Sequence, residues 1–105
     1  MATANKILGI NDEVTTCEDC GKKNLNRTVV ILRSDGSVVH VGTSCAVKYL
    51  GMTKSHSNYN SISRIAKAVM YYKRWITVYP GNQSKILSNI RAHFAVADEA
   101  VLNNI

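Results

Sequence analysis

The clearest pattern of hydrophobic and polar positions lies in the first half of the chain, where two β-branched runs follow one another. They span residues 28–33 and 37–41, and the turn between them contains Asp35-Gly36. An Asp-Gly pair between two such runs is among the strongest local signals of a hairpin, because Gly readily adopts the positive φ that a tight turn requires. The pattern therefore predicts an antiparallel β-hairpin.

Short elements are predicted on both sides of this hairpin. After it, Thr43 or Ser44 is a natural N-cap for a short helix over residues 45–50, which Gly51 closes. Before it, residues 1–16 carry a weaker pattern of apolar positions, which predicts a short strand or turn that packs on the next part of the chain.

The second half of the chain has the apolar spacing of helices. After a polar, turn-prone link over residues 52–60, one helix is predicted over residues 61–79, where Pro80-Gly81 ends it. Another is predicted over residues 83–102, because apolar residues recur there at helical spacing. We expect the two helices to pack as an antiparallel pair.

The composition is that of one small folded domain. The chain has 105 residues, of which 46% are hydrophobic and 19% charged, and it contains no low-complexity run or internal repeat. Its first residues lack the pattern of a secretion signal, and no apolar stretch approaches the ~20 residues needed to cross a bilayer. We therefore expect a cytoplasmic protein with no membrane partner.

The residues with the most distinctive chemistry are the three cysteines, Cys17, Cys20 and Cys45. In a reducing compartment, metal binding or redox chemistry is expected of them rather than a disulfide. A thioredoxin-like pair would open a helix in a βαβ setting, whereas a hairpin follows Cys20. The tight turn Cys17-x-x-Cys20-Gly21 holds two thiolates, and Cys45 lies on the first turn of the short helix, where the helix dipole favours a thiolate. The spacing predicts that the three converge on one Zn²⁺.

The order Cys-x-x-Cys-Gly, hairpin, then Gly-Thr-Ser-Cys-Ala opening a helix resembles the treble-clef zinc finger over residues 17–51, particularly the small zinc modules of phage and bacterial proteins. This resemblance implies a fold and a metal more than an activity. A treble clef usually takes its fourth ligand from the same helix, three residues after the third, where this chain has Lys48. The fourth ligand is therefore expected from another segment.

The three histidines are the first candidates for that ligand, because structural zinc is four-coordinate. His56 ranks first, since it lies just past the short helix in a segment that can fold back. His40 is alternatively a half-exposed cross-strand residue, and His93 reaches the site only if the last helix packs across it. A carboxylate such as Asp19, a water molecule or a partner's side chain would also complete the site.

These expectations combine into an α+β fold in two parts. Residues 1–57 form a treble-clef-like zinc-binding module of β-hairpin and short helix. Residues 58–105 form an antiparallel pair of α-helices that packs on the module within one compact domain. The pattern neither demands nor excludes a dimer through the helical pair.

The first long helix is predicted to have an apolar and a basic face. The apolar face carries Ile62, Ile65, Ala66, Val69, Tyr72 and Ile76. The opposite face carries Arg64, Lys67, Tyr71 and Arg74, with Trp75 at its edge, and further contacts to phosphate are assigned to Lys73, Lys22, Lys23 and Arg27. Cations neutralise phosphate and aromatic rings stack on bases, so this set is the predicted nucleic-acid surface. Alternatively, the cations form an ordinary solvated face, and Tyr71 and Trp75 pack against the zinc module or an oligomer partner.

The net charge of the chain favours two classes of binding partner. Thirteen Lys and Arg against seven Asp and Glu leave a formal charge of +6 and a pI of about 9.4, which favours nucleic acid or an acidic protein surface. The first hypothesis is nucleic-acid binding, and the second is a zinc-stabilised interaction module, such as a phage-type effector that inhibits a host protein. An enzyme is not expected, because no set of positioned catalytic groups is recognisable.

Overall fold

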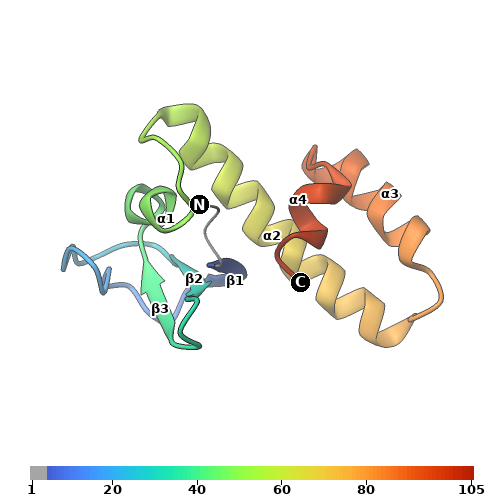
Figure 1. The fold of residues 1–105 in the computed structure, drawn as a ribbon, viewed down its shortest axis with the longest axis horizontal. Coiled ribbons are helices and arrows are strands. Elements are labelled where there is room, and N and C mark those ends of the chain that lie inside the picture. Colours follow the sequence, from blue (N-terminus) through green and yellow to red (C-terminus); the bar gives the residue numbers. More distant parts are fainter. Residues whose placement is uncertain (1–4) are drawn as a thin grey trace.

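The computed structural model describes residues 5–105 and has the predicted α+β fold. Its elements are β1 (Lys6–Asn11), β2 (Thr28–Leu32), β3 (Val38–Val41), α1 (Thr43–Tyr49), α2 (His56–Val78), α3 (Gln83–Phe94) and α4 (Asp98–Leu102). The strands form one antiparallel sheet in the order β1-β2-β3. Figure 1 shows the sheet and α1 on one side of the long helix α2, and α3 and α4 on the other. Residues 1–4, which begin the predicted zinc module, lie outside the described residues.

The predicted hairpin is confirmed as β2 and β3. Val29 pairs with Val41 and Ile31 with Val39, so that alternate residues of both strands face the core. The strand or turn expected within residues 1–16 is β1, which pairs with β2 and has an irregular register between Ile7 and Gly9.

The helix α1 begins earlier than predicted. Its N-cap is Gly42, in extended conformation and without a side-chain cap, so Thr43 and Ser44 are helical residues and the prediction that one of them caps the helix is wrong. The end is as predicted, because Gly51 adopts a φ of 70° and lets Met52 N–H return to the Val47 carbonyl.

The helix α2 also begins earlier, at His56, so the predicted link over residues 52–60 is shorter than expected. Ser55 is the cause. Its hydroxyl accepts a hydrogen bond from the Asn58 backbone N–H at 3.2 Å and caps the first turn. The other end agrees with prediction, since α2 stops at Val78, two residues before Pro80.

The single last helix predicted over residues 83–102 is two helices, so this expectation is wrong in its extent. Ala95 adopts a left-handed conformation with a φ of 54°, which ends α3. After this turn, the side chain of Val96 is buried in the core, and α4 begins at Asp98. Apolar spacing alone does not reveal the break, because Val96 and Val101 both enter the same core.

The long helix α2 contributes to two clusters of buried side chains. Ile62 and Ala66 pack with the sheet, α1, Cys17 and Cys45. Ala68 and Tyr72 pack instead with buried residues of α3 and α4, which are Ile86, Leu87, Ile90, Val96 and Val101. One long helix, α2, therefore lies between the cysteine-bearing segments on one side and α3 and α4 on the other, as Figure 1 shows. Within the described part of the chain, none of the helices is long and apolar enough to cross a membrane.

A close approach of α2 to β1 gives a prediction at Gly9. A Cβ added to Gly9 would lie 2.5 Å from Cγ of Met70. We expect Gly9→Ala to lower the free energy of unfolding by about 2 kcal/mol, because overpacking forces the helix or the side chain to move. Urea denaturation measures this value. Gly81→Ala is the control, since the space beside Gly81 is open; equal stability of the two variants would contradict the prediction.

Candidate metal centre

The three cysteines converge as the sequence predicts. The sulfur atoms of Cys17, Cys20 and Cys45 all lie within 4.8 Å of one another. Cys17 and Cys45 are buried and Cys20 is exposed, so the cluster lies at the edge of the sheet-side core with one ligand toward solvent. Three sulfur ligands at this spacing form a site that can hold a metal ion such as zinc.

The first two cysteines are held by a tight turn. The Cys17 backbone N–H donates to the Lys22 carbonyl, and the Gly21 N–H donates to the Cys17 carbonyl, both at 2.9 Å. Gly21 adopts a φ of 79°, which confirms the predicted reason for a glycine after Cys20. The backbone hydrogen bonds of this turn thus position the Cys17 and Cys20 side chains next to one another.

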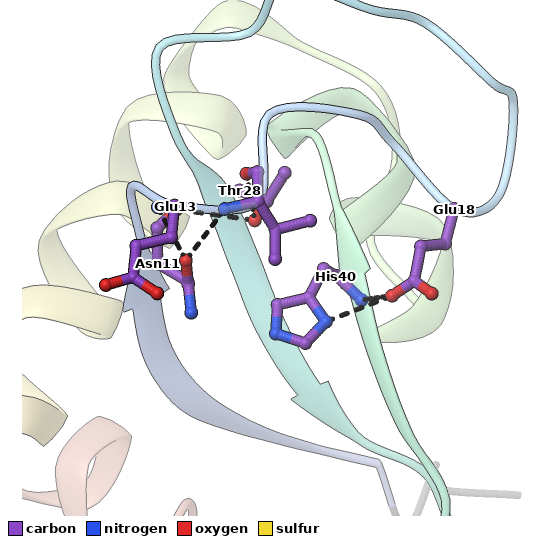
Figure 2. Close-up of polar contacts among 6 residues, drawn as sticks. Asn11, Glu13, Glu18, Thr28 and His40 are labelled. Carbon is purple, nitrogen blue, oxygen red and sulfur yellow. Dashed lines mark hydrogen bonds and ion pairs between the residues drawn. The ribbon is translucent and has the colours of Figure 1, made fainter.

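The loop that carries this turn is hydrogen-bonded to residues of all three strands. Asn11, at the end of β1, accepts hydrogen bonds from Glu13 N–H and Val14 N–H through its side-chain oxygen, and the Thr28 hydroxyl donates to the Val14 carbonyl at 3.0 Å (Figure 2). On the other side, the Glu18 N–H donates to the His40 carbonyl of β3 at 2.8 Å. The sheet therefore supports the ligand-bearing turn from two directions.

The electrostatics of the cluster favour one thiolate at Cys17. Burial opposes its ionisation, but hydrogen bonds from backbone N–H groups, those of Cys20, Gly42 and Asp19, and from the Cys45 thiol bring the pKa of Cys17 down to about 7. Burial and the two neighbouring sulfurs raise the pKa of Cys45 to about 12. Without metal, the first thiolate therefore forms at Cys17 and not at Cys45, where the helix dipole was expected to favour it.

The described residues include no histidine in the cluster. His56 is the exposed first residue of α2, and His93 is exposed near the end of α3. His40 faces Glu18, whose Oε1 lies 3.0 Å from the ring Nδ1 and accepts a hydrogen bond from the His40 backbone N–H at 2.6 Å, as Figure 2 shows. These hydrogen bonds lower the pKa of Glu18.

Asp19 is a carboxylate of the cysteine turn that acts on the electrostatics of the cluster. It interacts with the thiol of Cys45, and its two oxygens also accept hydrogen bonds from Lys48 Nζ at 2.5 Å and from the Tyr49 hydroxyl at 3.1 Å. Lys48, at the position where a treble clef usually has its fourth ligand, thus holds the acidic residue beside the sulfurs.

The metal site gives a prediction about pH. Zinc that binds these sulfurs would displace the Cys17 proton at pH 6, below the pKa of about 7, whereas at pH 8 that proton would already have left. Zinc binding should therefore release roughly one proton fewer at pH 8 than at pH 6. Titration calorimetry in buffers of different ionisation enthalpy measures this difference. Equal release at both pH values would contradict the assigned thiolate.

A second group of predicted residues lies together beside α2. Arg27 from the loop before β2 and Arg64 and Lys67 from α2 line a depression of about 580 Å³. We call it the basic hollow, and its lining is completed by Ser57, Asn60, Ser61 and Ser63. Sequence reasoning missed these four polar residues because half of them lay in the predicted link, although residues 57, 60, 61 and 64 have the spacing of one helix face.

The other predicted nucleic-acid residues do not all join this hollow. Lys22 and Lys23 are exposed in the loop after Cys20. Lys73 is half-buried on the other side of α2, where burial and the nearby charge of Lys6 lower its pKa. Its assignment to the same surface as Arg64 is therefore wrong, since nine residues at 100° place the two on opposite sides of the helix.

Tyr71 and Trp75 of α2 pack against the cluster that contains α3, and not against the cysteine-bearing side. Tyr71 and Trp75 are half-buried on the α3 side, and the Tyr71 ring meets Phe94 edge-on at 5.7 Å between centroids. Arg74 is exposed, with its guanidinium carbon 5.8 Å from the centre of the Trp75 ring. No family model, curated protein or solved structure matches this chain, so the roles of these residues are inferred from their geometry and chemistry.

Proposed function

We propose that this chain is a small treble-clef zinc protein that binds nucleic acid through the basic hollow. The observation that carries the proposal is the convergence of Arg27, from the loop before β2, with Arg64 and Lys67 of α2 on one depression. Phosphate groups are bound in proteins by such cations together with hydroxyl and amide donors, and the hollow offers both.

The charge around the hollow supports this function. Among residues 5–105 the ion pairs join carboxylates to His40, Lys48 and Arg91, and the three cations of the basic hollow have no carboxylate partner. Their charge is therefore available to an external anion. Three phosphate contacts would release about three condensed counterions, which gives affinity without sequence specificity.

The metal has a structural part in this proposal. Zinc held by Cys17, Cys20 and Cys45 would link the cysteine turn to α1 and so close the chain segment between Cys20 and Cys45, which includes Arg27. Because Cys45 lies in the first turn of α1, which packs against α2, the same ion would fix this segment relative to Arg64 and Lys67. Asp19 or a water molecule would complete the four ligands, since Asp19 belongs to the cysteine turn and its carboxylate helps to raise the pKa of Cys45.

Fluorescence anisotropy of labelled oligonucleotides tests the function. The zinc-loaded protein should bind DNA or RNA with micromolar or tighter affinity at low salt, and a plot of log K against log salt concentration should have a slope of roughly −2 to −3. Absence of binding to single strands and duplexes at low salt would overturn the proposal. It would favour the second hypothesis from the sequence, a module that binds an acidic protein surface.

A further inference from the structure

A groove lies at the far end of α2, where the chain turns into α3. Its volume is about 440 Å³, and its lining residues are Tyr71, Trp75, Tyr79, Asn82, Lys85, Ile86 and Asn89. We call it the aromatic groove. It is separate from the cysteine cluster and from the basic hollow, with which it shares no residue.

The rings of this groove are already ordered for stacking. Trp75 and Tyr79 are parallel to within 10°, with centroids 5.9 Å apart. Trp75 is also supported by Tyr71, which packs in turn against Phe94 of α3. Tyr79 is 50% exposed, so part of the stacked surface is open to solvent. A flat aromatic ligand would therefore find a preformed platform and would lose little free energy in ordering it.

The polar residues around the platform define the ligand further. Asn82 and Asn89 offer amide donors and acceptors, which suit the edges of nucleobases. Lys85 adds a positive charge, Arg74 lies over Trp75, and no acidic residue lines the groove. A flat ring with hydrogen-bonding edges and an attached anion meets all three requirements, and a nucleotide has this chemistry.

We propose that the aromatic groove binds an unpaired base of a single-stranded nucleic acid, whose phosphates continue to the basic hollow. This inference rests on the proposed function and names its substrate class. A base in a duplex has its faces covered by stacking and its pairing edge occupied, so it cannot use the platform. Arg64 and Trp75 lie within about 20° of one another around α2 and about 16 Å apart along its axis. One extended strand of a few nucleotides can therefore reach both sites.

The single tryptophan of the chain reports directly on this site. We expect a single-stranded oligothymidylate of about 12 nucleotides to quench the fluorescence of Trp75 in step with binding measured by anisotropy. A duplex of the same length that binds the basic hollow should leave this fluorescence nearly unchanged.

Tyr79→Ala and Val78→Ala provide matched variants, because both side chains are at least half exposed and only Tyr79 lines the groove. Tyr79→Ala should weaken single-strand binding about tenfold, as loss of one stacking ring predicts. Val78→Ala should bind like the parent protein. Melting temperatures of both variants confirm that they remain folded.

The outcomes separate this inference from the proposed function. Salt-dependent binding without Trp75 quenching, or equal binding by the two variants, would overturn the base site and leave phosphate binding by the basic hollow intact. Equal quenching by single strand and duplex would also overturn it. Absence of any anisotropy change at low salt would overturn both proposals.

Discussion

Removal of zinc by a strong chelator is expected to lower the melting temperature of this protein by roughly 15–30 °C. With free zinc at about a thousand times its dissociation constant, binding contributes about 4 kcal/mol, and each kcal/mol corresponds to roughly 4–8 °C in a domain of this size. The effect is large because Cys17 and Cys45 belong to the core cluster of the sheet and α1, so the metal–sulfur bonds would be part of the free energy that holds this core together.

Differential scanning calorimetry with and without chelator measures this shift in melting temperature. The variant that best isolates the effect of losing a metal ligand is Cys20→Ser. The Cys20 side chain is exposed, so its replacement removes a ligand and little packing. Ser44→Ala is the control, since Ser44 is an exposed neighbour of Cys45 and is not part of the cluster. Two results together would contradict the metal site: Cys20→Ser melts at the same temperature as Ser44→Ala, and the chelator leaves the melting temperature of the parent protein unchanged.

Loss of two cations from the basic hollow is expected to weaken nucleic-acid binding about 50-fold at 0.1 M salt. Each phosphate contact contributes roughly 0.7–0.9 to the salt slope, so the double variant Arg64→Gln/Lys67→Gln should also flatten that slope by about 1.5. Both side chains are exposed on α2 and line the hollow, so the fold should be unaffected.

A second double variant controls for net charge. Lys6→Gln/Arg33→Gln removes the same number of charges, from +6 to +4, at positions outside the basic hollow. Anisotropy titrations over a range of salt concentrations compare the two proteins. If both variants lose affinity equally, the binding depends on overall charge and the hollow is not the site.

The sheet and the cysteine cluster were predictable because their signals are local. Asp35-Gly36 determines the hairpin turn, and the spacing of Cys17, Cys20 and Gly21 determines a tight turn whatever the rest of the chain does. The convergence of Cys45 follows from these two features, since a hairpin returns the chain to its starting point and the next helix begins there.

The helix limits were less predictable because they depend on single polar contacts and on tertiary packing. One hydroxyl, that of Ser55, extends α2 by a turn into a segment of low apolar content. The break at Ala95 has no Gly or Pro to mark it, and it is stabilised by burial of Val96 and by the ion pair of Arg91 with Asp98. Apolar spacing and helix propensity are judged over many residues, so they do not detect single contacts of this kind.

For the same reason, only some of the predicted basic residues lie together in the structure. The helical wheel brings Arg64 and Lys67 to one side, but only the folded chain brings the Arg27 loop to them. The partner of Asp19 could not be read from spacing either, since Lys48 reaches it across 29 residues. Long-range placement of this kind requires the tertiary structure.

Native mass spectrometry of the purified protein with a single-stranded oligothymidylate of about 12 nucleotides tests the central claim most directly. The sample is sprayed from dilute ammonium acetate, in which charge-driven complexes persist. We predict a complex of one chain, one zinc ion and one oligonucleotide, and loss of zinc and oligonucleotide together in Cys20→Ser. A folded chain that carries zinc but no oligonucleotide, or one that binds the oligonucleotide without zinc, would contradict it.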